Sequence, residues 1–160
     1  MIDWSTDHKD AMHPIEAQAL DSPSEYVSSQ ARRYVASQGA DIDHPFAERV
    51  ILLYFRGRKS GHIRRVPLVC VEDGDDLLIV GSKGGADHHP AWYLNISAHP
   101  NVWVRNKADF YEAHATTLEG EERAAAWPKI VETMSFFGGY EKKTDRVMPV
   151  VRLSRSSHSG

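Results

Sequence analysis

Residues 56–65 hold the densest group of side chains suited to chemistry in this sequence. Five of these ten residues are cationic, and two glycines, Gly57 and Gly61, lie among them. The cationic residues are Arg56, Arg58, Lys59, Arg64 and Arg65. Like charges in one loop repel each other unless an anion compensates them. The pattern is typical either of a loop that binds a phosphate or carboxylate group or of a solvated basic hairpin end, and the loop alone does not decide between the two.

A second glycine-rich basic segment, residues 81–87, precedes a predicted helix. A glycine-rich loop at a helix N-terminus presents free backbone N–H groups and the positive end of the helix dipole, and both suit an anion. If the two segments converge in space, Lys59 and Lys83 would flank one anionic group. The N–H groups of Gly84 and Gly85 would then form a nest for it. The two segments together indicate an anion site better than either one alone.

Aromatic residues follow the second segment and recur near the C-terminus. Trp92 and Tyr93 either offer an aromatic face to a flat heteroaromatic ligand or form the core face of a short helix. Phe136, Phe137 and Tyr140 either cover an apolar pocket or pack within their own loop. Both alternatives stay open for each set.

Several familiar catalytic and binding motifs are missing from the sequence. The first basic segment lacks the spacing of a Walker A phosphate loop, and no G-x-G-x-x-G dinucleotide motif occurs. Ser60 and Ser82 lie outside the G-x-S-x-G context of a hydrolase nucleophile. His88 and His89 are adjacent, so their side chains point in different directions, and no third ligand follows at metal-site spacing. We therefore expect neither a metal site nor nucleophilic catalysis.

Composition and charge favour a single soluble domain with a local anionic partner. The 160-residue chain is 41% hydrophobic and 26% charged, and its net charge of −3 argues against a nucleic-acid-binding protein. Its one cysteine, Cys70, lies in an apolar run and is expected to be a buried, unreactive thiol outside any disulfide framework. No secretory signal occurs, and no apolar run reaches about 20 residues. We expect a cytoplasmic protein, with peripheral membrane contact left open.

Apolar periodicity predicts an α+β protein built on a small antiparallel barrel. Ser22 is the expected N-cap of a first helix that ends at Gly39. Nearly continuous apolar runs predict strands covered on both faces at residues 50–55, 66–71 and 76–81. Three further strands are predicted at residues 102–105, 110–115 and 148–153. Two more helices are predicted at residues 90–96 and 119–134. The remaining predicted segments are a flexible acidic tail at 1–20, a loop at 135–145 and a C-terminal tail at 156–160.

Seven short motifs occur in order between residues 21 and 153. They are Gly57-Arg58-Lys59-Ser60-Gly61, Arg64-Arg65-Val66-Pro67-Leu68, Asp73-Gly74, Ser82-Lys83-Gly84-Gly85-Ala86, Pro90-Ala91-Trp92-Tyr93 with Asn95, Glu122-Arg123 with Pro128, and Thr144-Asp145-Arg146 with Met148-Pro149-Val150. As a set, these motifs closely resemble the deazaflavin-dependent nitroreductase family. The lead-in from Ser22 to Gly39 is similar to that family's N-terminal helix.

The resemblance implies a split β-barrel over residues 21–155, with about six mainly antiparallel strands and about three helices. It implies coenzyme F-420, a deazaflavin with a phosphate and an oligoglutamate tail. The residues implied for coenzyme binding are Arg58, Lys59, Ser60, Arg64, Ser82, Lys83, Gly84, Gly85, Ala86, Pro90, Trp92 and Tyr93. Arg65 is the alternative to Arg64, and the spacing from Gly61 favours Arg64. Tyr140 and Ser82 are the implied hydrogen-bond or proton donors to the acceptor.

The implied reaction is hydride transfer from the reduced coenzyme to a small-molecule acceptor such as a quinone, an activated nitro compound or a conjugated enone. Two alternatives stay open, namely an FMN-dependent oxidoreductase on the same barrel and a protein that binds a deazaflavin without turnover. Phe136 and Phe137 stand where nitro-active members carry tyrosines, so the resemblance to those members is weakest at this segment. A lipid quinone as acceptor would imply peripheral membrane contact, and the oligomeric state is not predicted.

Overall fold

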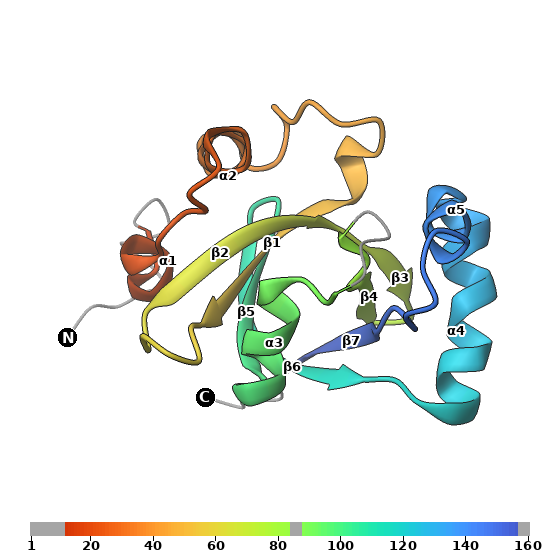
Figure 1. Cartoon of the computed structure of the whole chain (residues 1–160). Coiled ribbons are helices and arrows are strands. Elements are labelled where there is room, and N and C mark those ends of the chain that lie inside the picture. Colours follow the sequence, from red (N-terminus) through yellow and green to blue (C-terminus); the bar gives the residue numbers. More distant parts are fainter. Residues whose placement is uncertain (1–11, 84–87, 157–160) are drawn as a thin grey trace.

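The computed structural model describes residues 12–83 and 88–156 (Figure 1). Its helices are α1 (Pro14–Gln18), α2 (Glu25–Ser37), α3 (Ala91–Ala98), α4 (Gly120–Thr133) and α5 (Phe136–Glu141), and a 3-10 turn spans Ala47–Arg49. Its strands are β1 (Val50–Arg56), β2 (Ile63–Val69), β3 (Val71–Asp73), β4 (Asp76–Val80), β5 (Asn101–Asn106), β6 (Asp109–Thr117) and β7 (Val150–Arg155).

These strands form one sheet in the order β2-β1-β5-β6-β7-β4-β3, and every pairing between them is antiparallel. The two edge strands, β2 and β3, are separated in the chain by Cys70 alone. The two edges of the sheet therefore come together, and the sheet curls into a barrel. This arrangement confirms the predicted α+β class with an antiparallel barrel. The predicted strand at 66–71 is instead two strands, because the chain bends at Cys70 and changes its pairing partner from β1 to β4.

The buried run of β1 shows why its strand pattern is continuous rather than alternating. One face packs inside the barrel with Val102, Val104 and Leu153, through Ile51, Leu53 and Phe55. The other face packs beneath α2 with Ala31 and Tyr34, through Val50, Leu52 and Tyr54. A strand covered on both faces reads as an uninterrupted apolar run. Figure 1 shows α1 and α2 beside β1 and β2, and α4 and α5 at the other end of the sheet, beside β4 and β7.

The segment predicted as an acidic tail contains a packed helix. Residues 1–11 lie outside the described part of the chain, but α1 follows them and buries Glu16, which is 3% exposed. Both carboxylate oxygens of Glu16 accept hydrogen bonds from Arg105, at 2.6 and 2.7 Å, and the Tyr54 hydroxyl donates to the same carboxylate. The tail prediction is therefore wrong for α1. Five helical residues are too few to show a period in the sequence.

Two further boundaries differ from the sequence prediction. Ser24, rather than Ser22, is the N-cap of α2, because the Val27 N–H donates to the Ser24 hydroxyl at 3.4 Å. The predicted loop at 135–145 contains α5, whose aromatic residues pack against α4. Cys70 is buried, as expected. Within residues 12–83 and 88–156, no helix has the length and apolar character needed to cross a membrane.

Candidate active site

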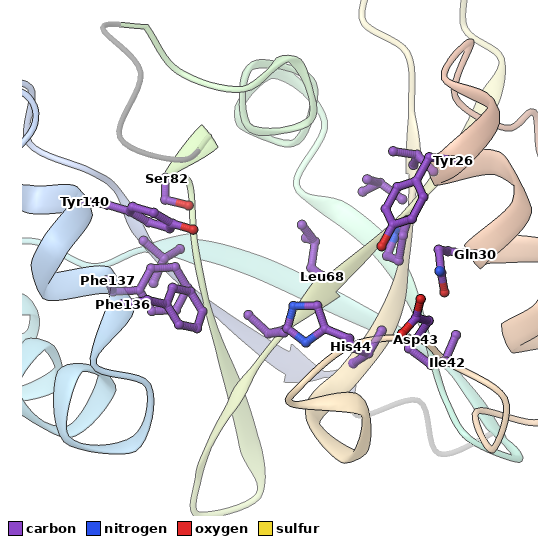
Figure 2. Close-up of a pocket in the computed structure, with 16 residues that line it drawn as sticks. Tyr26, Gln30, Ile42, Asp43, His44, Leu68, Ser82, Phe136, Phe137 and Tyr140 are labelled. Atoms are coloured by element: carbon purple, nitrogen blue, oxygen red, sulfur yellow. The ribbon is translucent and has the colours of Figure 1, made fainter.

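A cleft of about 300 Å³ opens between α2, β2 and α5 (Figure 2). β2 contributes residues 66–69, and Ser82 lines the cleft just after β4. The α2 wall consists of Tyr26, Val27 and Gln30, and the α5 wall consists of Phe136, Phe137 and Tyr140. Most of the lining is apolar, so water held there gains few hydrogen bonds and an apolar ligand can displace it.

The α5 wall is both packed and exposed to the cleft. Phe137 is buried, and its ring lies 4.4 Å from that of Phe136, centroid to centroid. Phe136 also contacts Tyr140 and Phe46, with ring centroids 5.4 and 5.6 Å apart. In Figure 2 the Ser82 and Tyr140 side chains point the same way, into the cleft. The packing of these aromatic rings therefore holds the Tyr140 ring in place, with its hydroxyl at the cleft.

Gln30 adds a polar atom to this apolar cleft. The residue is 7% exposed, and its Oε1 atom is buried without a hydrogen-bond partner among the described residues. A buried amide oxygen without a partner costs free energy that a ligand N–H or O–H can recover. Sequence reasoning missed Gln30, because one polar residue on a helix face carries no motif.

The first basic segment is tied to α3 by Asn95. The side-chain oxygen of Asn95 accepts hydrogen bonds from the backbone N–H of Arg58, at 3.0 Å, and from its guanidinium, at 2.9 Å. Asn95 is buried, so this contact fixes the tip of the β1–β2 hairpin relative to α3. Lys59 and Ser60 are exposed on the same tip. Asn95 was present in the sequence motifs but was not predicted as a site residue.

The two adjacent arginines of β2 have different surroundings. Arg65 forms a bidentate pair with Asp21, at 2.6 and 3.2 Å, and only 10% of its side chain is exposed. Arg64 makes a weaker contact, 3.5 Å from its guanidinium to the Asp21 carbonyl. Side chains alternate along a strand, so Arg64 shares a face with Val66 and Leu68, while Arg65 shares the other face with Pro67 and Val69. Residues of both faces line the cleft, so alternation does not separate the two arginines. The ion pair with Asp21 does separate them, because it commits Arg65 to the N-terminal segment.

The second basic segment is described only at residues 81–83. Gly84, Gly85 and Ala86 lie outside the described residues, and with them the predicted nest of N–H groups. Lys83 is exposed, and its ammonium lies 2.6 Å from Nε2 of His88. Gly81 packs so tightly that an added Cβ would lie 2.8 Å from the Pro149 ring, which explains a glycine at this position.

The predicted ring-side residues of α3 lie away from the cleft. Trp92 is 8% exposed and packs in the barrel core, as the core interpretation of this residue expects. The Tyr93 hydroxyl pairs with the Thr117 hydroxyl at 2.9 Å and lines a separate groove beside β6. Pro90 is buried at the start of α3. Of the predicted site residues, the structure brings Ser82 and Tyr140 together at one cleft, while Trp92 and Tyr93 do not line it.

A model of the F-420H(2)-dependent quinone reductase family matches residues 26–155 of the chain. The matched range contains all seven strands, both basic segments and the cleft walls from Tyr26 to Tyr140. The site just described therefore lies wholly inside the matched range.

Individual relatives agree with this match. An F-420H(2)-dependent quinone reductase of Mycobacterium tuberculosis is 32% identical over 114 residues, which are 69% of this chain and 76% of the relative. A solved structure described as an F-420-H2 dependent reductase is 39% identical, with a TM-score of 0.62, over 66% of this chain and 94% of that one. Another, described as a domain-swapped dimer, is 36% identical, with a TM-score of 0.65, over 83% of this chain and 100% of that one.

Proposed function

Because the chain belongs to the F-420H(2)-dependent quinone reductase family, we propose that it transfers a hydride from reduced coenzyme F-420 to a quinone in the cleft between α2, β2 and α5. The observation that carries the proposal is the polarity of β2. Arg64 lies at the end of this strand beside the cationic hairpin tip, and residues 66–69 farther along the strand line the apolar cleft. A ligand with an anionic tail and a flat ring fits this arrangement, with the tail at the cationic hairpin tip and the ring in the apolar cleft.

The residues present fit coenzyme F-420 on two counts. The hairpin tip offers the exposed cations Arg58 and Lys59, which suit the phosphate and carboxylates of the tail. The cleft offers an aromatic wall and the unpartnered amide oxygen of Gln30, which suit a ring that carries polar atoms at its edge. FMN also has a flat ring and a phosphate, so only a direct comparison of the two ligands separates them.

We assign roles to the site residues on this basis. Arg58, Lys59, Arg64 and Lys83 hold the anionic tail, with Ser60 and the residues Gly84, Gly85 and Ala86 as the remaining parts of the cradle. Arg64 is favoured over Arg65 as a ligand, since Arg65 already pairs with Asp21. Trp92 supports the site through the barrel core rather than by stacking on the ring.

The bound coenzyme supplies the hydride, and this chain supplies position and proton transfer. A quinone that accepts a hydride becomes an anion, and one proton on its oxygen completes the hydroquinone. We assign the donation of a hydrogen bond or of that proton to the hydroxyls of Ser82 and Tyr140, because both residues line the cleft. Phe136 and Phe137 exclude water from the same wall, which strengthens the interaction of a hydroxyl with a developing negative charge.

The experiment that tests the proposal mixes the protein with reduced F-420 and a naphthoquinone and follows the return of oxidised-coenzyme fluorescence. We expect tight F-420 binding and catalysed oxidation that needs both protein and quinone. Binding without oxidation by any quinone would support a non-catalytic deazaflavin-binding protein. Binding of FMN with no binding of F-420 would support an FMN-dependent oxidoreductase on the same barrel. Nitro compounds and enones, tested in the same assay, remain predictions.

The assembly and location of the protein are further parts of this proposal. We expect a homodimer, because one similar solved structure is described as a domain-swapped dimer. Sedimentation equilibrium measures this directly. Contact with a membrane surface depends on the acceptor being a lipid quinone, and co-sedimentation with vesicles that contain such a quinone tests it.

A further inference from the structure

Arg146 lies between α5 and β7. It contacts residues at the start of the second basic segment and His89, which follows that segment. Its guanidinium donates to the carbonyl of Gly81 at 2.9 Å and to the carbonyl of Ser82 at 2.8 Å. The same guanidinium lies 2.7 Å from Nδ1 of His89. One partly buried side chain, that of Arg146, therefore joins Gly81 and Ser82 to His89.

The contact with His89 fixes the protonation of that imidazole. Arginine carries only hydrogen-bond donors, so Nδ1 of His89 accepts, and the ring is neutral with its proton on Nε2. Burial, and then the positive charge of Arg146, lower the pKa of His89 below its ordinary value. The His89 ring also contacts the Tyr93 ring of α3, with ring centroids 5.2 Å apart.

The contacts at Gly81 and Ser82 fix the direction of a backbone turn. The Gly81 N–H donates to the Pro149 carbonyl at 2.9 Å, while Arg146 holds the carbonyls of Gly81 and Ser82. The Ser82 side chain lines the cleft and points into it in Figure 2. Arg146 therefore holds the backbone that carries this side chain without lining the cleft itself.

We propose that Arg146 is a positioning residue of the coenzyme site, which holds the backbone of Gly81 and Ser82 against His89 in the geometry that binds F-420. The inference rests on the proposed function. It also links the two walls of the site, since Arg146 follows α5 by only a few residues and α5 carries Tyr140. Loss of the guanidinium leaves two carbonyls and the His89 Nδ1 atom without this donor, so Gly81 and Ser82 are no longer joined to His89 through Arg146.

The test compares Arg146→Gln with Arg152→Gln. Arg152 is a matched control, because it is also a partly buried arginine with several partners, Asp73 and Glu122 at 3.0 Å each, but it lies on β7 beside α4. Three quantities are measured for both variants: the Kd for F-420 by fluorescence titration, the melting temperature, and the pKa of His89 by NMR.

For Arg146→Gln we expect a Kd at least tenfold higher than that of the wild type and a raised His89 pKa, with a melting temperature close to that of the Arg152→Gln control. For Arg152→Gln we expect an unchanged Kd and an unchanged His89 pKa. A wild-type Kd for Arg146→Gln would overturn the inference, whatever happens to the melting temperature. If Arg146→Gln does not fold, Arg146→Lys keeps the charge without the planar fork. The raised Kd is then still expected, a wild-type Kd would still overturn the inference, and the His89 pKa should change less than in Arg146→Gln.

Chemical rescue separates positioning from a general loss of structure. Millimolar guanidinium ion should lower the raised Kd of Arg146→Ala several-fold, because the ion can occupy the vacated site, whereas sodium chloride at equal ionic strength should not. Arg152→Ala should show no response to either salt. Absence of rescue together with an unchanged His89 pKa would overturn the inference. Wild-type protein that binds no F-420 at all would instead remove the proposed function and this inference with it.

Discussion

Lys59 and Lys83 project from the two basic segments, and both are exposed, so their charges are available to an anion. Each is expected to donate a charge-assisted hydrogen bond to the phosphate or carboxylates of the coenzyme. Such bonds contribute about 1.5–3 kcal/mol each. Lys59→Ala and Lys83→Ala should therefore each raise the Kd for F-420 by roughly 10- to 150-fold, measured by fluorescence titration.

Lys129→Ala is the control for this pair of substitutions. Lys129 is also exposed, but it contacts Asp73 on the far side of the barrel, at 3.2 Å. Its loss should leave coenzyme affinity unchanged. Unchanged affinity in both Lys59→Ala and Lys83→Ala would remove the two-segment cradle from the site.

The two hydroxyls at the cleft lead to a prediction about turnover rather than affinity. Tyr140→Phe keeps the ring that packs on Phe136, and Ser82→Ala keeps the backbone contacts to Arg146. If either hydroxyl donates the proton, its removal should slow single-turnover hydride transfer by about 10²-fold or more, since general acid catalysis is typically worth at least that factor. Coenzyme Kd should change little. Wild-type rates in both variants would mean that water supplies the proton.

Cys70 marks the bend between β2 and β3, and its thiol is buried at 5% exposure. Burial raises the pKa of the Cys70 thiol to about 11. A raised pKa favours the neutral thiol in the folded state, so the stability it contributes is complete below about pH 9 and is lost as the pH rises through 11. We expect an aromatic disulfide reagent at pH 8 to react with Cys70 only as fast as the protein unfolds. Rapid reaction of the native protein would contradict the burial.

The two basic segments were visible in the sequence through their charge density, and the resemblance pointed to Ser82 and Tyr140, which line one cleft in the structure. Asn95 and Gln30 were not assigned, since a single buried amide becomes informative only when its neighbours are known. The choice between Arg64 and Arg65 needed the structure for the same reason. The sequence predicts that the two side chains point to opposite faces of a strand. It does not show that Arg65 pairs with Asp21, which lies 44 residues away in the chain.

At the scale of elements, α1 is held to the barrel chiefly by one buried ion pair. The Glu16 side chain is 1% exposed and that of Arg105 is 14% exposed. Removing one partner of a buried pair leaves the other charge uncompensated, which typically costs about 3–5 kcal/mol. Glu16→Gln should lower the free energy of unfolding by about that amount in a chemical denaturation experiment.

Glu25→Gln is the matched control, since Glu25 pairs with Arg32 at 3.1 Å on α2. Both of those side chains are largely exposed, at 86% and 53%, and exposed pairs contribute about 0–1 kcal/mol. A small, equal effect of the two substitutions would show that α1 does not depend on the buried pair.

Element prediction succeeded where the apolar pattern was long and failed where elements were short. β1 and the strand pair β5–β6 were placed within one or two residues. The continuous apolar run of β1 reflects two covered faces, whereas burial alternates along most of β5 and β6. The helices α1 and α5 have only 5 and 6 residues, so neither completes two turns of a recognisable period. Both are stabilised by tertiary contacts, the first through Glu16 and the second through its aromatic cluster.

At the scale of the whole molecule, a local cluster of positive charge contrasts with the negative net charge. The net charge is −3, yet three exposed cations, Arg56, Arg58 and Lys59, lie together at the β1–β2 hairpin tip. The acidic N-terminal segment packs against β2 through Asp21. The apolar cleft lies farther along the same strand. Attraction of the coenzyme tail is therefore an electrostatic property of one end of the site, whereas acceptor binding depends on apolar contact at the other end.

This separation predicts different salt responses for the two ligands. Exposed charges are screened when the Debye length falls from about 10 Å at 0.1 M salt to about 3 Å at 1 M. Raising sodium chloride from 0.1 to 1 M should therefore weaken F-420 binding by roughly tenfold or more, as measured by fluorescence titration. The KM for an uncharged quinone at saturating coenzyme should stay within about twofold, because apolar burial is not screened. Equal weakening of both ligands would place the acceptor at the charged end and contradict the assignment of the cleft. Salt-independent binding of the coenzyme would instead mean that its anionic tail does not reach the hairpin tip.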